Sequence, residues 1–92
     1  MELCLKDIKN EHKITISPTK ESEIRSEKRN LELVFWRILI AGLMWQKEND
    51  IYKISKTINR SRSTSIYYVH KFDNEIKYNK NFINFVNRQF YV

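Results

Sequence analysis

The segment from Arg60 to Ser65, which reads RSRSTS, combines two guanidinium groups with four hydroxyl groups. An arginine fork suits phosphate or the O6 and N7 atoms of guanine, and serine and threonine hydroxyls bond base edges or phosphates. The same residue types also make an ordinary capped helix start that faces solvent. Taken alone, the segment therefore supports both a binding interpretation and a purely structural one.

Apolar residues on both sides place this segment at the joint between two helices. The isoleucines of residues 51–58 recur at i, i+3 and i+7, which puts them on one face of a short helix. The same spacing recurs over residues 69–76. Asn59 between them tolerates positive φ and so favours a turn. Two helices joined by such a turn form a helix-turn-helix unit, whose second helix can enter a DNA major groove.

The run from Leu31 to Trp45 is the predicted core helix, because twelve of its fifteen residues are apolar. It is too short for a membrane span, which needs about 20 apolar residues, and it contains Glu32 and Arg37. A helix apolar on several sides is one that other helices surround. Gly42 weakens a helix by about 1 kcal/mol relative to Ala, which suggests that another helix crosses closely there.

Several aromatic residues of this run are too large to hide easily in so small a domain. We expect Trp36 and Trp45 to be core or interface anchors. A homodimer contact that also uses Phe35 and Ile40 is the open alternative.

The segments at either end complete an all-α prediction. Polar and apolar side chains alternate over residues 13–17, as they do in a short strand. No partner strand is evident further along the chain, so residues 1–20 are expected to form a flexible or loosely docked arm. Residues 46–50 form a loop, and a closing helix follows the break at 79–81. The predicted fold is a compact four- to five-helix domain over residues 21–92 with a helix-turn-helix, similar to the Trp repressor.

The charge is uneven along the chain. Residues 1–50 carry nine basic and nine acidic side chains, whereas residues 51–92 carry eight basic and two acidic ones. The whole net charge of +6 therefore lies on the helix-turn-helix half, as expected for a nucleic-acid interface. The other interpretation is a compositional bias, since Asn, Ile, Lys and Tyr supply 37 of the 92 residues.

Other function classes find little support in the sequence. Cys4 is the single cysteine, and His12 and His70 lie far apart, so neither a disulfide nor a metal site is expected. No nucleophile–base pair or carboxylate cluster suggests an enzyme, a cofactor or a small-molecule substrate. The N-terminus lacks the long apolar core of a signal peptide, and we expect a cytoplasmic protein without a membrane partner.

The residues around the predicted turn resemble a known family. Residues 60–65 and the pair Lys71-Phe72 match the positions of a helix that begins Arg, Asp, His, Ser or Thr, Thr, Val and ends in Lys and an apolar residue. Arg29 and Arg37 share the spacing of two arginines ahead of its apolar helix, and NKNF at residues 79–82 resembles its final helix start. This pattern is similar to the C-terminal DNA-binding domain of the replication initiator DnaA, over residues 25–90.

The resemblance implies a minor-groove role for Arg29, phosphate contacts for Arg37 and Arg60, and base contacts for the start of the second helix. The chain departs from the family at Ser61, where the family has Asp, and at two further positions of the signature, where Arg replaces His and Ser replaces Val. The chain has no room for an ATPase domain, and its single glycine excludes a Gly-rich phosphate loop. We therefore expect a stand-alone module, of the kind that a phage or mobile element carries.

Two functions follow as predictions. The first is a small double-stranded-DNA-binding protein that regulates transcription or replication and reads the major groove with the helix starting near Arg62. The second is a helical interaction or structural protein, such as a phage factor that binds a host protein, with an exposed patch of Phe35, Trp36 or Trp45. The residues expected to contact DNA are Arg29, Arg37, Lys53, Lys56, Arg60, Ser61, Arg62, Ser63, Thr64, Tyr67 and Lys71.

Overall fold

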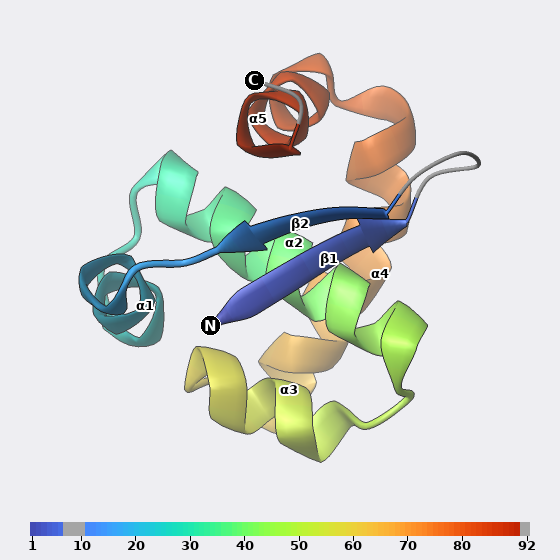
Figure 1. Ribbon diagram of the computed structural model, residues 1–92. Helices are drawn as coiled ribbons and strands as arrows, with labels where there is room; N and C mark the ends of the chain where they lie inside the picture. The colour runs from blue at the N-terminus through green and yellow to red at the C-terminus, as the bar shows by residue number, and fades with distance from the viewer. Residues whose placement is uncertain (7–10, 91–92) are drawn as a thin grey trace.

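A computed structural model describes residues 1–6 and 11–90 of the chain, and within them it contains five helices and a two-stranded sheet (Figure 1). The elements in chain order are β1 (Glu2–Lys6), β2 (Glu11–Thr15), α1 (Pro18–Arg25), α2 (Leu31–Lys47), α3 (Ile51–Ile58), α4 (Arg62–Tyr78) and α5 (Lys80–Phe90). The predicted helical class and the count of four to five helices are confirmed. The small sheet corrects the all-α prediction.

Helix α2 is the centre around which the other elements pack. Asn30 caps its start, since the Asn30 side chain accepts a hydrogen bond from the Leu33 N–H (2.9 Å). Side chains are buried without interruption from Phe35 to Leu43, as expected of a helix enclosed on several sides. The hairpin crosses one side of α2 and α4 contacts it from behind, while α3 and α5 lie toward opposite edges (Figure 1).

Gly42 marks the closest approach of α2 and α4. A Cβ atom added at Gly42 would lie 2.1 Å from Cγ of Phe72, which is far inside van der Waals contact. The absence of a side chain at this position therefore lets the Phe72 ring lie directly on the α2 backbone. This contact confirms the prediction that another helix crosses α2 closely at its single glycine.

The N-terminal segment forms an antiparallel hairpin. Leu3 pairs with Ile14 and Cys4 with Lys13, so the expectation that the second strand has no partner is wrong. The partner precedes the strand in the chain. Leu3 and Ile16 are both buried, and the hairpin contributes to the core instead of lying apart as a flexible arm. The predicted boundary at residues 20 and 21 falls inside α1.

None of the helices in the described part of the chain is long and apolar enough to cross a membrane.

Because Gly42 contacts Phe72, we predict that Gly42→Ala destabilises the protein, whereas helix propensity alone predicts that it stabilises. In an exposed helix, Gly→Ala stabilises by about 1 kcal/mol. Here the added methyl group must displace the Phe72 ring or separate α2 from α4, and overpacking of this kind costs about 1–3 kcal/mol. We expect Gly42→Ala to lower the free energy of unfolding, measured by urea denaturation. The double variant Gly42→Ala/Phe72→Leu should lose less than the sum of the two single variants, and strict additivity would contradict the contact.

Candidate nucleic-acid interface

Helix α3 and its terminating turn follow from three residue types. Asp50 caps the start by accepting a hydrogen bond from the Lys53 N–H (3.1 Å). Ile54 and Ile58 lie on one face and are fully buried. Asn59 ends the helix in the left-handed region, at φ 55°, and is the only residue with positive φ among those described. The predicted turn at Asn59 is therefore confirmed.

The polar segment at the start of α4 divides into residues that fold the chain and residues that face solvent. The Ser61 hydroxyl accepts a hydrogen bond from the Thr64 N–H (3.2 Å), and Ser61 is the N-cap of α4. Ser65 is fully buried, and its hydroxyl lies 2.9 Å from that of Ser55 on α3. A small residue there lets the two helices approach. Ser61, Arg62 and Ser63 are exposed, whereas Arg60 and Thr64 are half-buried.

Arg37 does not lie at the surface. Its side chain is 1% exposed, and its guanidinium donates to the carbonyls of Ile24 (2.9 Å), Ser26 (3.1 Å) and Lys28 (2.7 Å). Burial lowers the pKa of Arg37, and the positive charge of Arg60 adds to this effect. The predicted phosphate contact at Arg37 is corrected: this arginine satisfies the carbonyls at the end of α1 and in the loop that follows.

Arg60 has a similar structural role in part. Its guanidinium donates to the carbonyls of Ser26 (2.6 Å) and Asn59 (2.9 Å), and its side chain is half-buried. Arg25 donates in the opposite direction, to the carbonyls of Lys56 and Thr57 near the end of α3. A cation near a helix C-terminus is stabilised by the negative end of the helix dipole. We call this set, Arg25, Arg37 and Arg60 with the carbonyls they bind, the arginine clasp.

The remaining predicted lysines differ in how strongly they are held. Lys53 pairs with Glu48 at 3.3 Å, and both side chains are at least half exposed. The Lys56 ammonium lies 4.7 Å from the centre of the Tyr52 ring. Lys71 is engaged by Glu75 at 3.4 Å.

Glu75 binds Lys71 from a mostly buried position. The hydrogen bond from Asn79 and the contact with Lys71 lower the pKa of Glu75, so this carboxylate stays ionised and retains Lys71. Lys71 is therefore less available to a partner than Lys56.

Three arginines, Arg29, Arg62 and Arg88, are exposed without an intramolecular partner in the described part of the chain, and the first two lie near the α3–α4 turn. Arg29 lies in the loop between α1 and α2, and Arg62 begins α4. The loop that carries Arg29 lies beside the α3–α4 turn, because the Ser26 carbonyl binds Arg60. The structure thus brings the loop of Arg29 and the start of α4 into one region.

The outward face of α4 contains two large side chains with apolar surface, Ile66 and Tyr67. Ile66 is 40% exposed and Tyr67 is 56% exposed, although both lie in a helix with a well-filled apolar face. Tyr67 was predicted to contact DNA, but Ile66 was missed. The signal was available, since Ile66 lies off the face formed by Val69 and Phe72 on a helical wheel. A shallow hollow beside this face is lined by Asn49, Asp50, Ile51, Tyr52, Ser55 and Arg62.

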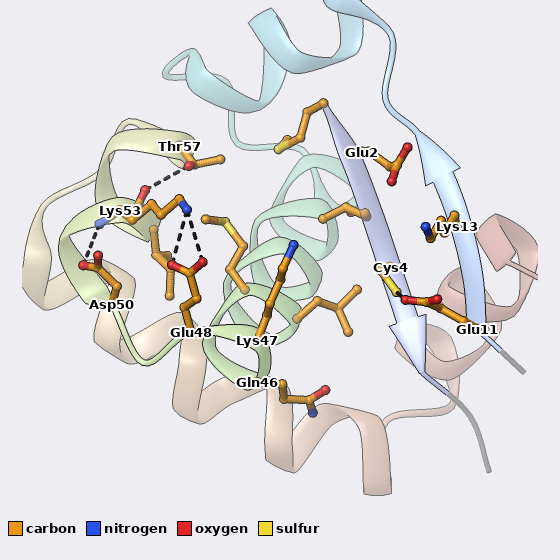
Figure 2. A pocket seen from close by; sticks show the side chains of 15 residues that line it. Glu2, Cys4, Glu11, Lys13, Gln46, Lys47, Glu48, Asp50, Lys53 and Thr57 are labelled. Atoms are coloured by element: carbon orange, nitrogen blue, oxygen red, sulfur yellow. Dashed lines mark hydrogen bonds and ion pairs between the residues drawn. The ribbon is translucent and has the colours of Figure 1, made fainter.

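A second hollow lies between the hairpin, the end of α2 and α3, away from the exposed face of α4 (Figure 2). Its walls carry mixed charge, and among the residues predicted to contact DNA only Lys53 borders it. Figure 2 shows the Lys53 side chain on α3 directed toward Glu48, the residue that follows α2. It also shows the Cys4 thiol, which donates a hydrogen bond to Glu11 across the hairpin (2.7 Å). No group of three or more His, Cys, Asp or Glu side chains that could hold a metal ion occurs among the described residues.

Two of the three aromatic residues named for the alternative function are not on the surface. Phe35 and Trp36 are buried against α5, where both rings contact Phe85. Trp45 is half-buried. The homodimer contact was predicted from some of the same aromatic residues. Because Phe35 and Trp36 are buried within the domain, they do not support that prediction.

Comparisons with protein-family models, with curated protein sequences and with solved structures give no match.

The role of Arg37 can be tested by separating stability from binding. Arg37→Met keeps an apolar stem but removes the donors to the Ile24 and Lys28 carbonyls. Each buried group left unsatisfied costs about 1–3 kcal/mol, so we expect a loss of about 2–6 kcal/mol in the free energy of unfolding. Arg37→Lys keeps the charge but not the planar fork, and its loss should be intermediate. The exposed control Arg29→Met should melt like the parent. A parent-like melt of Arg37→Met would refute the structural role.

Proposed function

We propose that this chain binds double-stranded DNA as a helix-turn-helix module and regulates transcription or replication. In this proposal α4 enters the major groove with its N-terminal end, and α3 crosses the backbone. The observation that carries it is the state of Arg62. This arginine is exposed at the start of α4 and has no partner among the described residues, whereas Arg37 and Arg60 are engaged by carbonyls.

The arrangement of α3 and α4 supports this mode of binding. Three residues, 59–61, separate the two helices, and the buried pair Ser55 and Ser65 joins them. A short turn of this length is typical of DNA-binding helix pairs. The first N–H groups of α4 attract a phosphate through the helix dipole, and Ser61 caps only part of them. Lys53 and Lys56 on the exposed side of α3 supply the charge for further phosphate contacts.

The resemblance to the DnaA C-terminal domain supports the same orientation. It implies that Arg29 enters a minor groove next to the major groove that α4 occupies. The loop of Arg29 is fixed beside the α3–α4 turn, because Arg37 binds the Ser26 and Lys28 carbonyls and Arg60 binds Ser26 as well. In our proposal Arg37 is thus a positioning residue for Arg29, in place of the phosphate contact that the family implies.

The proposal predicts steep salt dependence. The available cations are Lys28, Arg29, Lys53, Lys56 and Arg62. About four or five positive charges held near the duplex, on phosphates or in its grooves, give a log–log slope of affinity against salt near −4, at about 0.9 per neutralised phosphate. Fluorescence anisotropy with a random duplex at several salt concentrations measures this slope. A flat dependence, or no binding at low salt, would exclude the DNA interface.

Arg62 and Lys56 should differ in what they contribute. Arg62→Ala should weaken the preferred duplex by about 1–3 kcal/mol and a random duplex much less, because base contacts specify sequence. Lys56→Ala should weaken both duplexes about equally and reduce the salt slope by about one, because phosphate contacts position the protein without reading sequence. Lys56 is a better comparison than Lys71, whose replacement would also remove the partner of Glu75. Equal losses for the two variants on both duplexes would show that α4 reads no bases.

A further inference from the structure

Ile66 is an exposed aliphatic side chain on the outer face of α4, next to the exposed ring of Tyr67. Its exposed fraction is 40%, while Ile54 and Ile58 on α3 are fully buried. The residues four positions before and after it, Arg62 and His70, are both exposed, whereas Val69, three positions after it, is buried. The buried apolar residues of α4 are Val69 and Phe72, so Ile66 is outside the core and is accessible to a partner.

The chemistry of the major groove offers one apolar target. Thymine is the base that presents a methyl group there, at C5, and apolar side chains contact it directly. Isoleucine suits this contact because its β-branched side chain is restricted at χ1 and loses little freedom on binding. We propose that Ile66 contacts the C5-methyl group of a thymine, which makes the preferred duplex thymine-containing at a defined position.

The spacing of α4 limits where this thymine lies. Ile66 follows Arg62 by four residues, a rise of about 6 Å along the helix. Successive bases of one strand are separated by about 3.4 Å, so the thymine lies about one or two steps from the base pair that Arg62 contacts. This inference rests on the proposed function, since it assigns a base to the same face of α4.

The test combines a protein substitution with removal of a single methyl group from the DNA. A preferred duplex is first selected with the full chain, and each thymine in it is then replaced by deoxyuridine, which lacks only the C5-methyl group. The parent should bind one substituted duplex about fourfold more weakly, as expected for burial of one methyl group. Ile66→Ala should not distinguish that duplex from the thymine original, and Ile66→Val should retain part of the difference.

Four outcomes would overturn the inference, and they differ from one another. The thymine contact would be refuted, with DNA binding intact, if no deoxyuridine replacement lowered the affinity of the parent. It would also be refuted if each replacement lowered the affinity of the parent and of Ile66→Ala equally. A parent that binds no duplex would refute the proposed function and this inference together. A shift from dimer to monomer in Ile66→Ala, by sedimentation and without coupling to deoxyuridine, would assign Ile66 to contact between two copies of the chain. Circular dichroism of the two variants verifies that they fold.

Discussion

The enclosed guanidinium of Arg37 is the interaction on which the arrangement of the other elements depends. A charged fork is buried only where its N–H groups find acceptors, and here the acceptors are carbonyls that the end of α1 would otherwise leave unsatisfied. The two needs are met by one side chain. Because Arg60 also binds Ser26, the same loop is joined to the α3–α4 turn. The arginine clasp thus holds the α1–α2 loop and the α3–α4 turn together.

The second constraint is the direct contact of Phe72 with the backbone of α2. A helix held this closely along its length cannot rotate about its axis without moving the Phe72 ring into α2. The buried serine pair at the other end fixes α4 against α3. The outward face of α4, with Arg62 and Ile66, is therefore held in place from two sides, as the proposed recognition of a DNA groove requires.

Much of the helical part could be predicted because its signals are local. Apolar spacing, the cap at Asp50, the turn at Asn59 and the close contact at Gly42 each depend on neighbouring residues or on one unusual residue type. The hairpin was harder to predict, since a strand needs a partner and the partner here precedes the strand whose side chains alternate. Arg37 was placed wrongly for a different reason: arginine is usually exposed, and burial depends on acceptors that sequence does not display.

The start of α4 shows why one polar segment has two tasks. Helical geometry turns successive side chains by about 100°, so a run of polar residues cannot all face the same way. The Ser61 hydroxyl caps the helix and the buried Ser65 hydroxyl joins it to α3, whereas the side chains of Arg62 and Ser63 extend into solvent. The structural and the binding interpretations of RSRSTS are therefore compatible. The hydrogen bonds of Ser61 and Ser65 fix the direction in which Arg62 and Ser63 extend. Arg62 therefore stays available at the N-terminal end of α4, which has positive dipole character.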